Sequence, residues 1–449
     1  MSSMQIIEAA QIEAKIIALV GNMSQDQDME LDEQIDSDTT LVADLDFGSM
    51  DFIKLVLALE DEFKQKLGFH DLLMSQGQYV EDLTIGALVS FVEQKLNSGT
   101  GIPAVNYQVI AAKTSTEETF AKIDDSKVAR FRETINGRIA ELESFSEEQV
   151  LPYEHNKEKN KQAIFILSPP RSGSTLLRII LAGHPKLFAP PELHLLTYAN
   201  LNQRKLALGG NVSIHLLQGA IRAIMQLENC SAEEAEILMQ NCESQGFTTK
   251  EFYHWIQQKL ADKILVDKTP TYASHVNILR RAEIEFENPL YIHLVRHPYG
   301  MIRSYETSKL ERVVPIMNQR SLTRREISEL TWLISHENIL EFFQDIPENR
   351  KLTLKFEDLV ADPESSIRNQ CQFLGLEFEP EMLNVYNEKQ QRMTDGVRQA
   401  SEMSGDLKFH LHTGIEPNVA NSWKRDQITD YLADRTWKVA NFLGYAQED

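Results

Sequence analysis

Residues 163–182 read Ala-Ile-Phe-Ile-Leu-Ser-Pro-Pro-Arg-Ser-Gly-Ser-Thr-Leu-Leu-Arg-Ile-Ile-Leu-Ala, and most of the expected fold follows from them. The first five residues form a continuous apolar run, which is typical of a parallel strand buried on both faces. A short loop follows, and the apolar positions from Leu176 onward predict a helix. A strand, a tight loop and a helix in this order direct backbone N–H groups and the helix dipole at an anion. We therefore expect an α/β domain with a central parallel sheet and a P-loop-like phosphate-binding loop.

The loop itself contains the residue types that an anion site needs. Gly173 allows the backbone to approach a phosphate closely, and Arg171 supplies a fixed positive charge. Three hydroxyl groups complete the expected binding set: Ser172, Ser174 and Thr175. The loop lacks the first Gly and the Gly-Lys-[Ser/Thr] order of nucleotide triphosphatases, so it is a different kind of phosphate loop. Taken alone, such a turn can also cap a helix without binding any ligand.

A second signal lies at residues 290–304. The apolar run 290–295 predicts another buried strand, Arg296 ends it, and Pro298 begins a helix that contains Ser304. Taken separately, Arg296 could be a surface arginine and Ser304 an exposed helical serine. If both lie at the carboxyl edge of the sheet, they can converge on one phosphate.

Together with the loop at 168–175, this pattern resembles the two nucleotide-binding signatures of sulfotransferases that use 3′-phosphoadenosine-5′-phosphosulfate (PAPS). The resemblance implies that the loop binds the 5′-phosphosulfate and that Arg296 and Ser304 bind the 3′-phosphate. Other segments that match are Val266–Pro270, Leu354–Leu359 as a strand ending in Glu-Asp, and a loop from Gly414 to Lys424 that closes over the nucleotide. The closing loop implies nucleotide contacts for Trp423 and Lys424. The resemblance covers residues 161–449.

Sulfonyl transfer needs a base for the acceptor hydroxyl and positive charge near the leaving nucleotide. Arg171 and Lys268 are the expected charge stabilisers. Glu192, in Pro190-Pro191-Glu192, matches the base of the carboxylate-using branch of the family, although an acid at this place could also be a solvated loop residue. The rival candidates for the base are three histidines: His194, His410 and His412. No cluster of His, Cys and acidic residues has metal-ligand spacing, so no metal is expected.

Composition narrows the function further. The 449 residues have a formal net charge of −22, which argues against binding to nucleic acid or to an anionic membrane. Residues 1–100 contain 19 acidic and 5 basic side chains and so contribute −14 of this charge, which indicates a separate domain. Three unpatterned cysteines, the absence of a signal peptide and the absence of a long apolar run predict a cytoplasmic protein without a membrane span.

The acidic segment has a helical pattern. Within residues 4–20, Ile6, Ala10, Ala14 and Ile17 fall at helical spacing, and an apolar segment at 83–96 predicts a closing helix. Between them, residues 52–63 form an amphipathic stripe that begins just after Ser49. A serine in this place commonly caps the helix.

Asp46-Phe47-Gly48-Ser49-Met50 and the acidic helix after it resemble the acyl carrier protein pattern, over residues 1–98. The family often has Asp where this chain has Gly48 and Leu where it has Met50. The resemblance implies an all-α four-helix bundle whose Ser49 bears 4′-phosphopantetheine, added by a phosphopantetheinyl transferase. A helix N-terminus favours the charge of the phosphodiester.

The expected domains are therefore a carrier at 1–98, a linker and connecting helix at 99–160, and a sulfotransferase domain at 161–449. The helix predicted within 117–150 either packs on the next domain or serves as a spacer. The pairing resembles carrier–sulfotransferase pairs of polyketide and olefin synthases, and implies sulfonation of a β-hydroxyl on the carrier-bound acyl chain. It also implies acyl-loading or polyketide synthase partners and a separate thioesterase, because no Gly-x-Ser-x-Gly elbow follows residue 300. The alternatives are sulfonation of a free small molecule, peptide or glycan, and a carrier scaffold with a non-catalytic nucleotide-binding domain.

Overall fold

A computed structural model describes residues 9–25, 35–42, 44–45, 47, 49–65, 67, 72, 74–75, 78–79, 82–97, 122–148, 158–209, 214–308, 322–395, 397, 414–425 and 430–446. The chain divides into two compact units. The N-terminal unit contains the described residues up to 97, and the C-terminal unit contains those from 122 onward. Within these ranges, no helix combines the length and apolar character that a membrane span requires.

The N-terminal unit is helical. Its described elements are α1 (Ala9–Gln25), α2 (Ser49–Phe63), β1 (Met74–Ser75), β2 (Gln78–Tyr79) and α4 (Ile85–Asn97). Helix α1 contacts both α2 and α4, and the apolar side chains between the helices form one core. The short antiparallel pair of β1 and β2 was not predicted. Ser49 is the first residue of α2. The four-helix carrier bundle remains a prediction.

The predicted apolar stripe of α1 is wrong at two alanines, whereas Ile17 packs against the core as predicted. Ala10 and Ala14 are exposed, whereas Ile12, Ile16 and Val20 are fully buried. The larger branched side chains bury more apolar area than alanines do, so they determine which face turns inward. The stripe predicted for α2 is confirmed at the positions that pack in the core: Phe52, Val56 and Leu59.

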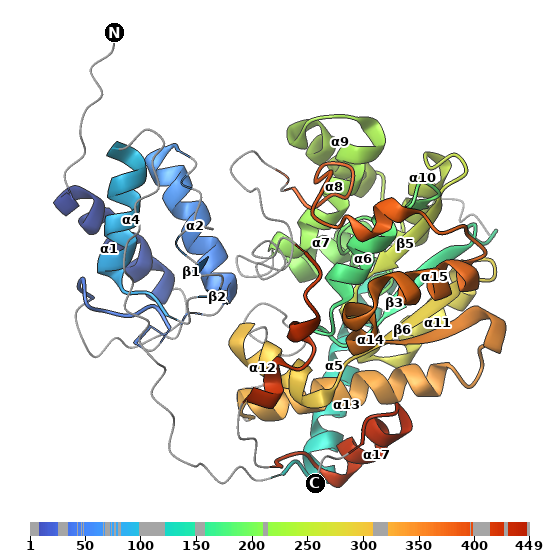
Figure 1. Cartoon of the computed structure of the whole chain (residues 1–449). Helices are drawn as coiled ribbons and strands as arrows, with labels where there is room; N and C mark the ends of the chain where they lie inside the picture. Colours follow the sequence, from blue (N-terminus) through green and yellow to red (C-terminus); the bar gives the residue numbers. More distant parts are fainter. Residues whose placement is uncertain are drawn as a thin grey trace. The chain divides into compact units, whose positions relative to one another are not determined.

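The C-terminal unit is built on a five-stranded parallel sheet, which confirms the predicted α/β class. The strand order is β4 (Leu187–Phe188), β5 (Ile264–Lys268), β3 (Ala163–Leu167), β6 (Leu290–Val295) and β7 (Lys351–Lys355). The strands run through the middle of the unit with helices around them (Figure 1). Every residue of β3 and β6 is buried, as the continuous apolar runs predicted.

The helices of this unit are α5 (Asp125–Glu148), α6 (Ser174–Ala182), α7 (Leu201–Leu208), α8 (Gln218–Glu228), α9 (Ala232–Ser244), α10 (Thr249–Gln258), α11 (Val276–Glu285), α12 (Pro298–Ser308), α13 (Arg324–Phe342), α14 (Phe356–Ala361), α15 (Pro363–Leu374) and α17 (Asp434–Phe442). Helix α6 packs on β4 and β5, while α11 and α13 pack on each other.

The strand order also locates a binding crevice. The chain leaves β3 toward β4 and β5, whereas it leaves β6 toward β7, although β3 and β6 are neighbours. Ligands of such sheets bind beyond the carboxyl ends of the two strands at which the order reverses. The loops after β3 and β6 contain Arg171 and Arg296.

Helix α5 packs on the C-terminal unit and is not a free spacer. Its apolar stripe is buried, at Val128, Phe131, Ile135 and Ile139. Lys127 pairs with Glu326 at the start of α13, and the Arg132 guanidinium lies 2.7 Å from the Glu337 carboxylate further along α13.

The segment predicted as a strand ending in Glu-Asp requires a correction. Strand β7 ends at Lys355, and Phe356 begins helix α14, so Glu357 and Asp358 lie in a first helical turn. Acidic residues are favoured there by the helix dipole. The Glu357 carboxylate accepts hydrogen bonds from the His297 backbone N–H at 2.9 Å and from the Tyr445 hydroxyl at 2.7 Å.

Candidate active site

The conformation of the loop after β3 requires glycine at position 173. Gly173 precedes the first residue of α6 and has φ of 89°, a left-handed conformation that L side chains rarely adopt. A Cβ atom there would lie 2.2 Å from the ring of Phe356, the first residue of α14. The aromatic ring therefore packs directly against the loop backbone and fixes its position.

Two buried hydroxyl groups in this loop make no hydrogen bond to a described residue. The Oγ atoms of Ser168 and Ser172 are buried and have no hydrogen-bond partner among the described residues. Buried polar groups in folded proteins are nearly always hydrogen-bonded, so orphaned donors beside a helix N-terminus indicate an anion site. Ser174 and Thr175 were predicted in the loop, with the helix beginning at Leu176, but they form the first turn of α6.

The structure brings the predicted phosphate ligands of the two distant stretches together. The Nε atom of Arg171 donates to the Ser304 hydroxyl at 3.2 Å, and the Arg296 guanidinium donates to the Arg171 carbonyl at 2.7 Å. Arg296 also lies over the Phe356 ring, 4.6 Å from its centroid. Arg171 has φ of 64°, a strained conformation of the kind that concentrates at functional sites.

The predicted closing-loop residues lie on the Arg296 side of this cluster. Trp423 stacks on the His297 ring at 4.2 Å between centroids and 16° between planes. A Cβ at Gly300 would lie 3.1 Å from Trp423 and 3.2 Å from Arg296, so the two side chains meet over this glycine. The Trp423 Nε1 atom is buried and has no partner within the described ranges. Lys424 is exposed, with its ammonium 5.3 Å from the Trp423 ring centroid.

A second cluster joins Glu192 to Lys268 at the end of β5. The Lys268 ammonium lies 2.5 Å from one Glu192 carboxylate oxygen and 3.5 Å from the Thr175 hydroxyl. The His194 Nε2 atom lies 3.2 Å from the other carboxylate oxygen. Lys268 and His194 are buried, whereas the Glu192 side chain is one third exposed. The carboxylate is thus flanked on both oxygens and open to the surface.

Glu192 is an ionised carboxylate in this setting. Burial raises its pKa, but the charge of Lys268 and the contact with His194 lower the pKa further, to well below the usual range. Glu192 is therefore deprotonated at neutral pH, which is the state that a general base requires. His194 adjoins it and has φ of 50°, while His410 and His412 lie outside the described residues.

Neighbouring elements hold the Glu192 turn in ways that the sequence pattern did not reveal. A Cβ at Gly219, in the first turn of α8, would lie 2.0 Å from the Glu192 carbonyl oxygen, so α8 packs on this backbone without a side chain between them. The buried guanidinium of Arg178, from α6, donates to the Ala189 carbonyl at 2.9 Å.

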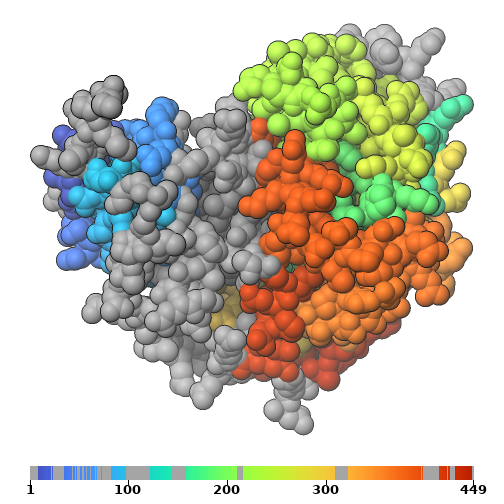
Figure 2. Space-filling view, turned by 45° about the horizontal axis from the view of Figure 1, so that its top comes forward, coloured from blue at the N-terminus to red at the C-terminus, as the bar shows by residue number. Residues whose placement is uncertain are grey.

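Figure 2 shows the α8–α9 pair beside the segment after α15, where the Arg222 guanidinium lies 2.8 Å from the Asp395 carboxylate.

The phosphate loop, the arginine–serine pair and the carboxylate–lysine pair all lie in elements that match one known family. The sequence model of the sulfotransferase family matches residues 163–380. The solved structure of the sulfotransferase domain from the curacin biosynthetic pathway is 36% identical, with a TM-score of 0.60. The match covers 65% of this chain and 100% of that domain. The chain belongs to the sulfotransferase family.

Two further relatives agree with this assignment. The sulfotransferase domain of the Synechococcus PCC 7002 olefin synthase is 36% identical, with a TM-score of 0.58, over 67% of this chain and 100% of that domain. Mouse carbohydrate sulfotransferase 4 is 25% identical over 232 residues, which are 49% of this chain. This sulfotransferase spans 53% of the mouse relative and 33% of a matching uncharacterized protein from Aquifex aeolicus.

The prediction that the chain is a sulfotransferase enzyme is confirmed by these matches. They concern the C-terminal unit, whose sheet and phosphate loop fall within the matched range. Among the residues that the structure describes, no group of three metal-ligating side chains is arranged to hold a metal ion. The roles of individual site residues, like the carrier assignment, remain predictions.

Proposed function

We propose that this sulfotransferase transfers the sulfonyl group of PAPS to a β-hydroxyl of an acyl chain that phosphopantetheine tethers to Ser49. The observation that supports this most is the likeness to sulfotransferase domains from the curacin pathway and from an olefin synthase, each covered over its whole length. One of these domains is named for a biosynthetic pathway and the other for an olefin synthase. An acidic helical unit in the same chain, with Ser49 at a helix N-terminus, fits a carrier for such a pathway.

The loop after β3 fits the phosphosulfate of PAPS. Its orphaned hydroxyls at Ser168 and Ser172 would find acceptors in the sulfate and phosphate oxygens, and the left-handed conformation of Gly173 turns the loop backbone into the start of α6. At the other end of the cluster, Arg296 and Ser304 would hold the 3′-phosphate. Trp423 and Lys424 would cover the nucleotide.

In the proposed reaction, Glu192 takes the proton of the acceptor hydroxyl as that oxygen attacks sulfur. The new O–S bond forms while the bond from sulfur to the bridging phosphate oxygen breaks. Lys268 and Arg171 stabilise the negative charge that develops on this leaving oxygen. The products are a sulfate ester and 3′-phosphoadenosine-5′-phosphate, with the proton on Glu192.

A carrier in the same chain would raise the acceptor concentration. Tethering by a short flexible linker gives an effective concentration in the millimolar range. The proposal requires a phosphopantetheinyl transferase and an acyl-loading or polyketide synthase enzyme. A separate thioesterase would act afterwards, using the sulfate ester as a leaving group.

Intact-protein mass spectrometry tests this proposal on the full chain. After phosphopantetheinylation, loading with a β-hydroxyacyl group and addition of PAPS, we expect a gain of one SO₃ unit on the acyl arm. Ser49→Ala should prevent loading and abolish this gain. Product formation only from free hydroxyl compounds would instead support a second candidate function, in which the acceptor is a free glycan. The match to a mouse carbohydrate sulfotransferase favours this alternative. Binding of PAPS without any product would contradict both.

We expect Ser304→Ala to raise the KM for PAPS by roughly tenfold to a hundredfold, because a hydrogen bond to a charged phosphate is worth about 1.5–3 kcal/mol. The kcat should fall less than the KM rises, because Ser304 reaches the reacting atoms only through its hydrogen bond with Arg171. Thr307→Ala is the matched control, because Thr307 is exposed one turn further along α12. Initial-rate kinetics measure both variants, and an unaltered KM in Ser304→Ala would remove Ser304 from the nucleotide site.

A further inference from the structure

The backbone that follows Glu192 is held by buried hydroxyl groups from the segment after β5. The Tyr272 hydroxyl accepts hydrogen bonds from the backbone N–H groups of Leu195, at 2.8 Å, and Leu196, at 3.3 Å. The Thr269 hydroxyl accepts a longer one, at 3.4 Å, from the His194 N–H. These two side chains belong to one short segment, so a shift of that segment would move the whole backbone from 194 to 196.

A single carboxylate orients these hydroxyls. Asp267, the fourth residue of β5, is 1% exposed. It accepts hydrogen bonds from the Tyr272 hydroxyl at 3.0 Å, from the Thr269 hydroxyl at 3.0 Å, and from the Tyr253 hydroxyl of α10. A carboxylate has enough lone pairs for three hydroxyl donors, whereas the single carbonyl oxygen of an amide would leave its NH₂ group facing hydroxyl protons. Asp267 therefore directs the lone pairs of Tyr272 and Thr269 toward the backbone beyond Glu192.

Asp267 and Lys268, at adjacent positions of strand β5, both hold residues 192–196. Neighbouring side chains on a strand point to opposite faces. Lys268 contacts the Glu192 carboxylate directly, while Asp267 acts two to four residues further on, through Thr269 and Tyr272. The end of β5 thus fixes both the side chain of Glu192 and the path of the backbone that follows it.

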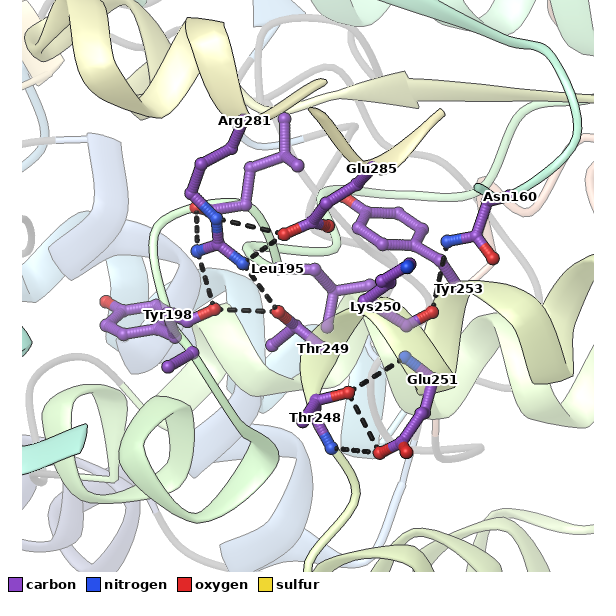
Figure 3. Close-up of polar contacts among 12 residues, drawn as sticks. Asn160, Leu195, Tyr198, Thr248, Thr249, Lys250, Glu251, Tyr253, Arg281 and Glu285 are labelled. Atoms are coloured by element: carbon purple, nitrogen blue, oxygen red, sulfur yellow. Dashed lines mark hydrogen bonds and ion pairs between the residues drawn. The ribbon is translucent and has the colours of Figure 1, made fainter. Parts of the chain in front are cut away.

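The end of this backbone that is far from Glu192, residues 196–198, is held by a different side chain. Figure 3 shows Arg281 of α11 among Tyr198, Thr249 and Glu285. Its guanidinium donates to the Leu196 carbonyl at 2.5 Å and to the Tyr198 carbonyl at 2.8 Å. Because Arg281 holds residues 196–198 whatever happens at Tyr272, loss of the Tyr272 hydroxyl should loosen the segment near Glu192 without unfolding it.

We propose that Asp267 and Tyr272 are positioning residues that set the place of Glu192 relative to Lys268 and His194. This inference rests on the proposed role of Glu192 as the base. It gives Tyr272 a role that Tyr253 lacks, although both hydroxyls are buried and both donate to the same carboxylate.

The paired variants Tyr272→Phe and Tyr253→Phe in the full chain test the proposal. Tyr272→Phe leaves two buried N–H groups without an acceptor, and a small displacement of a catalytic group lowers rates by about tenfold to a hundredfold. We expect a fall of that size in kcat for Tyr272→Phe, with the KM for PAPS unchanged, because the loop and Arg296 do not touch this network. Tyr253→Phe should keep kcat within about twofold, since both N–H groups retain their acceptor.

The pH profile separates positioning from loss of stability. Glu192 faces Lys268, His194 and, from α6, Arg178. If Tyr272→Phe loosens the contacts with Lys268 and His194, the pKa of Glu192 rises toward its ordinary value and the acid limb of kcat moves to higher pH. Equal losses of kcat in both variants, with an unmoved acid limb, would show that the hydroxyls serve stability alone and would overturn the proposal.

Hydrogen exchange provides a readout that needs no turnover. The peptide containing residues 193–198 should exchange faster in Tyr272→Phe than in Tyr253→Phe, and equal protection would also overturn the proposal. If the chain without substitutions, phosphopantetheinylated and loaded, sulfonates neither its acyl arm nor a free acceptor, the proposed function fails. The exchange result still decides whether Tyr272 positions this segment.

Discussion

Glu192→Gln is expected to lower the single-turnover rate of sulfonation by roughly 10²- to 10⁴-fold, the usual contribution of a positioned general base. Glutamine has the same shape but takes no proton at neutral pH. The change also leaves the Lys268 ammonium, 2.5 Å away, without its negative partner. Lys268 would remain beside Thr175 at the donor side of the site, so binding of PAPS should be retained.

His194→Gln is the comparison that assigns the base. Its Nε2 atom lies 3.2 Å from Glu192, so removal of the imidazole should perturb the carboxylate and lower the rate less than Glu192→Gln does. Rapid-quench measurement of one turnover gives the chemical step, and calorimetric titration with 3′-phosphoadenosine-5′-phosphate checks nucleotide binding. Near-normal chemistry in Glu192→Gln together with a large loss in His194→Gln would transfer the role to the histidine.

Gly173→Ala should abolish tight nucleotide binding and also destabilise the C-terminal unit. An L residue in the left-handed conformation costs about 1–2 kcal/mol. Overpacking against the Phe356 ring, 2.2 Å from the new methyl group, adds about 1–3 kcal/mol. Any loop donor that is displaced from its phosphate loses a further 1.5–3 kcal/mol or so of binding energy.

Gly375→Ala separates the two contributions. Gly375 ends α15 with φ of 68° and has no atom within 4 Å of an added Cβ, so this change introduces the backbone strain without the crowding. Thermal unfolding and nucleotide titration should show a modest loss of stability and normal binding for Gly375→Ala. If both variants bind the nucleotide equally well, the ring of Phe356 does not constrain the phosphate loop.

The sheet and the phosphate site follow from local patterns in the sequence. The strands β3 and β6 are buried apolar runs, and each is followed at once by the turn and helix that place Arg171 or Arg296 at the same edge. Local patterns of this kind predict structure well because an apolar run followed at once by a turn and a helix leaves the backbone few other conformations. The start of α14 at Phe356 was not predictable in this way, because the contact of Glu357 with the His297 backbone is made across the sheet edge.

Contacts to backbone carbonyls and N–H groups leave almost no trace in a sequence. Arg178 and Arg281 hold the chain around Glu192 by donating to carbonyl oxygens, and any residue type can supply a carbonyl. Tyr272 likewise accepts from two main-chain N–H groups. A charged residue inside an apolar strand was the available signal for this network, and Asp267 in Ile264–Lys268 is such a residue. In the N-terminal unit, the helices were predictable, whereas the proposed modification of Ser49 is a chemical step that an assay must test.

Helix α5 has a practical consequence for modular engineering. Its buried stripe and its cations, Lys127 and Arg132, cover α13, and the Lys122 ammonium lies 3.1 Å from Asp430 near the C-terminus. A fragment cut directly before β3 would expose this apolar surface to water and leave Glu326 and Glu337 without these partners. A catalytic fragment that is moved into another protein should therefore begin upstream of Lys122, so that α5 stays packed on α13.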